Sequence, residues 1–283
     1  MEKLKLEEYQ LNGFIIIPNC ITKESIESVF ESTTALLRSY TSKTEFSCLF
    51  DRSFQNFEDV EFHHSLRTLR EKDPKCFSSF YEACKLLISV KRLTIGHAAL
   101  TSISTLLDVP ENSLSMANPQ LRFDFPKDTI NWFGWHQENP YFDYDESKGG
   151  TDKDALNINL NKDMNITFWT PLVPVNHSNG SVRICVGSHK EGYFHGPYDW
   201  PHESPVAKSV VDKYKVIDVV ANPGDLALFH GNLVHRSGDN TGETVRICTT
   251  VRIHSLLTEE CKQNFSKRFA LYDGTDGKAS DHF

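Results

Sequence analysis

The sequence lacks the features that mark several large classes of protein. Seven cysteines are scattered over 283 residues without a Cys-x-x-Cys pair, which argues against a zinc cluster or a disulfide framework and for free thiols. No apolar run approaches the ~18 residues of a membrane span. The first residues also lack the continuous apolar stretch of a secretory signal. We therefore expect a cytoplasmic protein with no membrane span.

A surplus of positive charge is also missing. The chain has 30 Lys and Arg against 38 Asp and Glu, a formal net charge of -8, which disfavours nucleic acid as a partner because few cations are available to neutralise phosphates. The sequence has no internal repeat and no low-complexity tract. Its hydrophobic content of 39% and charged content of 24% are those of an ordinary globular protein. The length suits one large domain or two small ones.

The first part of the chain combines a strand with helices. Gly13 to Pro18 is a short β-branched run stopped by proline, which predicts a buried strand. Thr22 follows as a plausible N-cap of an amphipathic helix. Apolar residues recur at helical spacing from about Pro74 to Leu107, with a possible break at Gly96. Each helix has one apolar stripe, so we expect the helices to cover one face of a sheet.

From about Met116 the pattern changes to short strands separated by turn residues. Asn179-Gly180 supplies the positive φ of a turn and is expected to join two of these strands as a pair. Many short strands of this kind predict a sandwich or jelly roll. The expected strands are 120–125, 165–175, 181–186, 214–220, 226–229 and 244–253.

Two long segments, 143–163 and 192–205, interrupt these strands. Loops of this length inside a compact domain are usually lids or binding loops, although 143–163 is explained equally well as a disordered insertion. We expect a single domain, 1–283. Within it, 1–115 forms a mixed strand and helical support, 116–255 a jelly-roll core, and 256–283 a C-terminal extension.

A candidate metal site begins at His136-Gln137-Glu138. In an extended segment alternate side chains share a face, so His136 and Glu138 project together while Gln137 points away. His235, which follows a later strand, could bring a second imidazole to the same point. Two histidines and one carboxylate form the facial triad of non-haem Fe(II) oxygenases. A lone His-x-Glu is weak support, because such tripeptides arise by chance.

Other polar residues could line the same cavity. If the strand of Arg246 returns antiparallel to that of His235, the Arg246 guanidinium can enter the cavity and offer a planar fork for a carboxylate. From spacing alone, an ordinary ion pair is the favoured role of Arg246. Gln120 and Arg122 alternate with Leu121, so both could point inward, although Arg122 is explained equally well as an exposed strand residue. Asn139 and Tyr141 could line the substrate mouth, and packing would also explain Tyr141.

Several motifs in a fixed order resemble the phytanoyl-CoA dioxygenase-like Fe(II)/2-oxoglutarate oxygenases. They span nearly the whole chain, and their combination is more specific than any one of them. They are Gly13-Phe14, Trp135-His136-Gln137-Glu138, Thr167-Phe168-Trp169, Asn179-Gly180-Ser181, Val186-Gly187-Ser188-His189-Lys190, Pro223-Gly224-Asp225, and His235-Arg236-Ser237 with Arg246.

The resemblance implies a fold, a ligand set and a cosubstrate. The fold would be a double-stranded β-helix, a cupin-like jelly roll that is mainly β with flanking α-helices. His136, Glu138 and His235 would hold Fe(II), with O2 as oxidant. Arg246, helped by Ser237, would bind the distal carboxylate of 2-oxoglutarate. Trp169 would lie near this cosubstrate, and Gln120 could touch it.

One departure concerns Glu138, because the family's usual ligand at this position is Asp. The longer side chain must retract to reach a metal at ~2.0–2.2 Å, but it remains an oxygen donor of the same charge. We therefore expect hydroxylation. The polar segment 143–163 and the aromatic segment 192–205 favour a small polar metabolite or carbohydrate-type substrate. The alternatives are a cupin-like isomerase or hydrolase that uses the triad without 2-oxoglutarate, and a non-catalytic binding module. The sequence assigns no oligomeric state.

Overall fold

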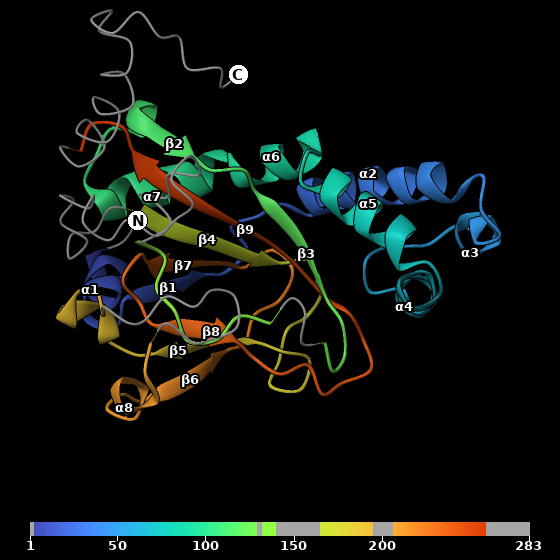
Figure 1. Ribbon diagram of the computed structural model, residues 1–283. Helices are drawn as coiled ribbons and strands as arrows, with labels where there is room; N and C mark the ends of the chain where they lie inside the picture. Colours follow the sequence, from blue (N-terminus) through green and yellow to red (C-terminus); the bar gives the residue numbers. More distant parts are fainter. Residues whose placement is uncertain (1–2, 129–131, 140–164, 195–205, 259–283) are drawn as a thin grey trace, which may run out of the picture.

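The computed structural model describes residues 3–128, 132–139, 165–194 and 206–258 (Figure 1). The helices in these ranges are α1 (Lys3–Asn12), α2 (Lys23–Thr41), α3 (Ser47–Phe50), α4 (Val60–Lys72), α5 (Pro74–Cys84), α6 (Ile88–Thr94), α7 (His97–Leu107) and α8 (Lys208–Val211), with short 3-10 turns η1 (Glu111–Ser113) and η4 (Ser188–Glu191). The strands are β1 (Phe14–Ile17), β2 (Leu114–Met116), β3 (Gln120–Asp124), β4 (Asn165–Pro171), β5 (Val182–Cys185), β6 (Val216–Val219), β7 (Leu226–His230), β8 (His235–Ser237) and β9 (Arg246–Ser255).

Three of the N-terminal helices, α2, α4 and α5, begin at residues whose side chains cap them. The side chain of Thr22 accepts a hydrogen bond from the backbone N–H of Ser25 at 3.2 Å, which caps α2 as predicted. The helical region predicted from Pro74 divides into α5, α6 and α7, and Gly96 is the N-cap of α7. Helices α1 and α4 were not predicted, although Asp59 caps α4 through two backbone N–H groups.

The strands form two antiparallel sheets that face each other in Figure 1. Among the described residues, the larger sheet has six strands in the order β1-β7-β4-β9-β2, with β3 also paired to β9. The smaller sheet has the order β6-β5-β8. Helices α2, α4, α5 and α6 lie on the outer side of the larger sheet.

Alternation along the strands separates two apolar cores. On β4, Ile166 and Phe168 point to the helices and join the larger core, while Trp169 points between the sheets and packs in the smaller one with Val182 and Ile184 of β5. The larger sheet is thus covered by helices on one face and by the smaller sheet on the other. This arrangement confirms the predicted jelly roll with flanking helices.

One expected strand pairing is wrong, and a second pairing, which was stated only as a condition, does not form. β4 and β5 follow each other across the Asn179-Gly180 turn, where Gly180 has φ +89°, but they belong to different sheets: β4 pairs with β7 and β9, and β5 pairs with β6 and β8. β9 likewise does not return beside β8, because the chain crosses from the smaller to the larger sheet between them. Jelly-roll connections bridge two sheets, and local turn residues do not distinguish such a bridge from a hairpin.

Several expectations concern residues outside the described ranges. They are the segment 143–163, most of 192–205 and of 256–283, and Tyr141. In the part of the chain that is described, no helix has both the length and the apolar character to cross a bilayer. The six described cysteines are unpaired thiols, as predicted.

Candidate metal and cosubstrate site

The segment carrying His136 and Glu138 is fixed by backbone hydrogen bonds to two later parts of the chain. His136 and His235 exchange N–H to carbonyl hydrogen bonds of 2.9 and 3.0 Å. Glu138 N–H donates to the carbonyl of Gly231 at 2.8 Å. These bonds hold the extended segment against β8 and against the turn after β7, so the first two candidate ligands are brought to the third.

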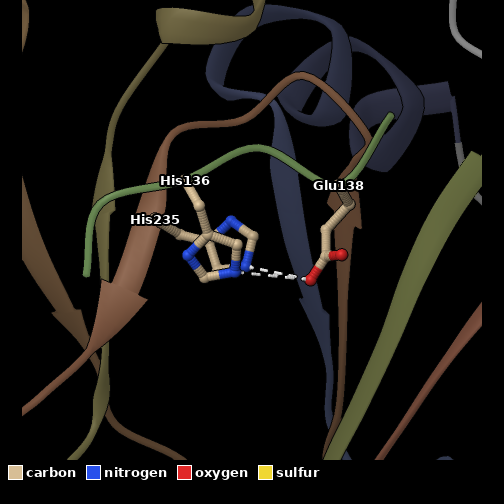
Figure 2. Close-up of side chains that lie close together, drawn as sticks. All are labelled: His136, Glu138 and His235. Atoms are coloured by element: carbon tan, nitrogen blue, oxygen red, sulfur yellow. Dashed lines mark ion pairs between the residues drawn. The ribbon is translucent and has the colours of Figure 1, made fainter. Parts of the chain in front are cut away.

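The three side chains converge on one point, as Figure 2 shows. Glu138 Oε1 lies 3.6 Å from His136 Nε2 and 3.5 Å from His235 Nε2. All three residues are buried. A metal held at ~2.1 Å would set neighbouring donor atoms about 3 Å apart, so this spacing is close to that of a ligand set on one face of a metal.

Both imidazoles are oriented by their other ring nitrogen. His136 Nδ1 lies 2.7 Å from the carbonyl oxygen of Gly134, and His235 Nδ1 lies 2.9 Å from that of Leu233. Because a carbonyl can only accept, each Nδ1 carries the proton and each Nε2 has its lone pair directed toward Glu138. This is the orientation that metal-binding histidines adopt.

The protonation states also suit a cation. Burial lowers the pKa of His136, and the neighbouring His235 lowers it further, which keeps the His136 ring neutral. Burial alone would raise the pKa of Glu138, but the charge of the Arg252 guanidinium opposes it, and the pKa lies well below the usual range. A neutral imidazole and an ionised carboxylate are the forms that bind a metal.

A second polar cluster lies on the inner face of the larger sheet. Asp124 of β3 accepts hydrogen bonds from Arg246 Nε at 3.0 Å and Nη2 at 2.5 Å, and from Arg122 Nη2 at 3.0 Å. Arg246 Nη1 also donates to the carbonyl of Gly180. One carboxylate therefore serves two guanidiniums, and the three side chains together carry one net positive charge in a buried place.

The other predicted cosubstrate residues come from both sheets: β3 and β4 belong to the larger sheet and β8 to the smaller one. Trp169 is buried on β4, in the same inner apolar core as Cys248 of β9. Gln120 of β3 lies opposite Thr250 of β9, in the same row as Trp169. The Ser237 hydroxyl accepts a hydrogen bond of 3.3 Å from the backbone N–H of Phe133.

Arg122 and Asn139, predicted to contact substrate, occupy different places. The Arg122 guanidinium stacks over the Phe133 ring, 4.6 Å from its centroid, in addition to its contact with Asp124. The Asn139 side chain is fully buried and accepts a hydrogen bond of 2.8 Å from Asn165 Nδ2.

Sequence reasoning missed Asp124 and Arg252, both of which contact predicted site residues. Asp124 continues the alternation of Gln120 and Arg122, so its inward direction could have been read from the same pattern. Arg252 lies an even number of residues after Arg246 on one strand, which places both on one face. Its contact with Glu138 carries no local signal in the sequence.

Comparisons with known proteins identify a family and a shared fold. A family model described as phytanoyl-CoA dioxygenase (PhyH) matches residues 9–248. A structure of the epimerase SnoN in complex with Fe3+, alpha ketoglutarate and nogalamycin RO superposes with a TM-score of 0.58 at 13% identity, over 99% of this chain and 92% of that one. EctD from S. alaskensis with 2-oxoglutarate and 5-hydroxyectoine gives a TM-score of 0.57 at 12% identity, over 90% and 77%. The non-heme monooxygenase ThoJ gives 0.54 at 17%, over 89% and 77%. At these identities the structural matches show a shared fold.

Proposed function

The chain belongs to the phytanoyl-CoA dioxygenase family, and on that premise we propose that it is an Fe(II)- and 2-oxoglutarate-dependent oxygenase. The observation that carries the proposal is the convergence of His136 Nε2, His235 Nε2 and Glu138 Oε1, with both Nδ1 atoms tied to backbone carbonyls. Two nitrogen donors and one oxygen donor on one side of a metal fit Fe(II) and leave positions for other ligands.

The cosubstrate end of the site is proposed at Asp124 and its two arginines. Arg246 would bind the distal carboxylate of 2-oxoglutarate, since a guanidinium fork matches a carboxylate and the cluster carries a net positive charge. Arg122 shares Asp124, so we place it at this end as well. Trp169 and Gln120 would flank the cosubstrate from neighbouring positions on the inner face, and Ser237 would border it from β8.

Iron and 2-oxoglutarate would supply the oxidation of a C–H bond by O2, and the protein would supply binding and orientation. The imidazoles and Glu138 hold their ligand atoms in place before a metal arrives. Phe229 stacks on His235 with ring centroids 5.9 Å apart, and the inner walls here are apolar. These walls would keep water away from the His235 ring.

We further propose hydroxylation of a small polar metabolite or carbohydrate-type substrate in one domain formed by 1–283. The polar side chains Asn139, Asn165 and Thr167 lie buried near Glu138, and among the described residues Thr167 Oγ1 and Asn165 Oδ1 have no hydrogen-bond partner. Hydroxyl groups of a substrate would satisfy such atoms. Asn139 remains a candidate substrate contact, with Tyr141 beyond the described residues.

A second candidate reaction is favoured by one relative. SnoN is described as an alpha ketoglutarate dependent epimerase, so the same iron site would also support epimerisation of a polar substrate. The cupin-like alternative is an isomerase or hydrolase that does not use 2-oxoglutarate. A variant of Arg246 distinguishes this alternative from the hydroxylase and the epimerase. Replacing Arg246 with Gln should raise the 2-oxoglutarate concentration needed for activity steeply if the cosubstrate binds there, and should change little if it does not.

The decisive experiment is anaerobic reconstitution with Fe(II) and 2-oxoglutarate. We expect a weak visible charge-transfer band from the iron chelate, loss of that band in His136→Ala, and succinate formation when air and a suitable substrate are added. A matched control is His97→Ala, because His97 is exposed and lies on α7, outside the site. Absence of both the band and succinate in the unaltered protein would refute the oxygenase proposal.

A further inference from the structure

The carboxylate of Glu138 is contacted on both of its oxygens. Oε1 faces the two imidazole Nε2 atoms at 3.5 and 3.6 Å, and Figure 2 shows the carboxyl group turned toward them. Oε2 accepts a hydrogen bond from Arg252 Nε. Glu138 is therefore held between the ligand cluster on one side and a guanidinium on the other.

Arg252 reaches this carboxylate from the larger sheet. On β9 the residues Ile247, Val251 and Ile253 point to the helices, so Arg246 and Arg252 share the inner face. Six residues of strand separate them, which is roughly 20 Å along the backbone. The two arginines consequently contact different carboxylates: Arg246 contacts Asp124, and Arg252 contacts Glu138. Arg252 does not belong to the proposed cosubstrate cluster.

The position of Arg252 on the sheet is well defined. Its Cα lies opposite Thr167 of β4, whose other neighbour is Phe229 of β7. Phe229 in turn stacks on His235. One row across the inner face of the larger sheet thus contacts both Glu138 and His235. Arg252 itself is about one-third exposed, with a side-chain exposed fraction of 36%, whereas that of Glu138 is 7%.

A glutamate ligand needs such a contact more than an aspartate would. Its extra methylene adds one rotatable bond between backbone and carboxylate, so an unrestrained Glu138 could rotate away from the imidazoles or present both oxygens to a metal. A hydrogen bond to Oε2 removes that freedom. Contacts to the outer atoms of metal ligands fix orientation in this way, and their loss typically costs about 10–100-fold in metal affinity.

We propose that Arg252 is a positioning residue that holds Glu138 Oε2, so that this longer carboxylate offers only Oε1 to the metal. The inference rests on the proposed metal site at His136, Glu138 and His235. It explains how Glu can replace the usual Asp at this position. The shorter Asp is restrained by its length, whereas Glu138 is restrained by its contact with Arg252.

A competing effect acts in the opposite direction. The guanidinium charge lies close to the place of a dication and repels it, so a purely electrostatic role for Arg252 would weaken metal binding. Removing the charge would then tighten binding. Loss of the positioning contact would weaken binding instead, so the sign of the change distinguishes the two roles.

The test uses Co(II) as the metal probe and the full chain. Co(II) affinity and the shape of its d–d absorption bands are measured for the unaltered protein, Arg252→Gln and Arg252→Lys. We expect about 10–100-fold weaker binding in Arg252→Gln, with altered d–d bands. Arg252→Lys keeps the charge but lacks the Nε–H group, and it should also bind Co(II) more weakly. Arg70→Gln is the matched control, because it breaks the Arg70–Asp128 pair of 2.8 Å away from the site.

A double-mutant cycle shows whether Arg252 acts through Glu138. Glu138→Asp draws the carboxylate away from Arg252 by one methylene, so in that background adding Arg252→Gln should change Co(II) affinity by less than about 3-fold. An effect of the same size in both backgrounds would overturn the proposal.

The failure of the inference is distinguishable from that of the proposed function. If the unaltered protein binds Co(II) through His136 but Arg252→Gln or Arg252→Lys binds it equally well or more tightly, the positioning role is refuted and the metal site stands. If His136→Ala leaves Co(II) binding unchanged, the metal site itself is refuted and the positioning role with it.

Discussion

Replacing Asp124 with Asn should destabilise the protein more than any exposed charge change. Asp124 holds Arg122 and Arg246, and the side-chain exposed fractions of the three are 12%, 16% and 3%. An amide of the same shape carries no charge, so the two buried guanidiniums would lose the counter-ion that they share. Breaking a buried pair by removing one partner costs about 3–5 kcal/mol. We expect the free energy of unfolding to fall by that amount.

Urea unfolding followed by circular dichroism measures this change directly. The matched control is Glu61→Gln, which breaks the exposed Arg52–Glu61 pair of 2.7 Å, with side-chain exposed fractions of 50% and 58%. An exposed pair contributes about 0–1 kcal/mol, so the control should be nearly neutral. A loss below about 1 kcal/mol in Asp124→Asn would show that the two arginines do not depend on this carboxylate, and would refute the reasoning.

Three further outcomes are expected. Burial alone would raise the pKa of Asp124, but the two guanidiniums outweigh it and the pKa is lowered. The stabilisation is therefore present above about pH 4 and is lost as pH falls through the folded-state pKa. Urea midpoints measured from neutral to acid pH should consequently fall less steeply in Asp124→Asn than in the unaltered protein. Gly231→Ala would place a Cβ atom 2.0 Å from Asn139 Oδ1 and should lower the free energy of unfolding by about 1–3 kcal/mol in a thermal unfolding experiment. The control Gly96→Ala, whose Cβ meets nothing nearer than 3.6 Å, should lower it by less. Equal losses in the two variants would contradict the packing argument. Gln137→Leu removes three hydrogen bonds, to the backbone of residues 192, 194 and 232. Hydrogen exchange at the backbone amide of residue 194 should therefore accelerate. Unchanged protection of that amide would show that Gln137 does not anchor residues 192–194.

Local patterns predicted the elements but not all of their partners. The strand at Phe14, the cap at Thr22 and the inward direction of Gln120 each follow from a few neighbouring residues, and the structure confirms them. Asn179-Gly180 was also read correctly as a turn. Its role as a connection between two sheets was missed, because the turn conformation is local whereas the pairing of β5 with β8 involves residues about fifty positions apart.

His136 and Glu138 share a face because side chains alternate in an extended segment whatever surrounds it, so this part of the site follows from the sequence. The order of motifs along the chain also indicates the family, which the family model confirms. The contacts that hold the carboxylates depend on tertiary packing. Asp124 joins arginines of two strands, and Arg252 reaches Glu138 across 114 residues of sequence. Such contacts depend on how the sheets pack and on the rotamers that packing leaves, and no spacing within the chain specifies them.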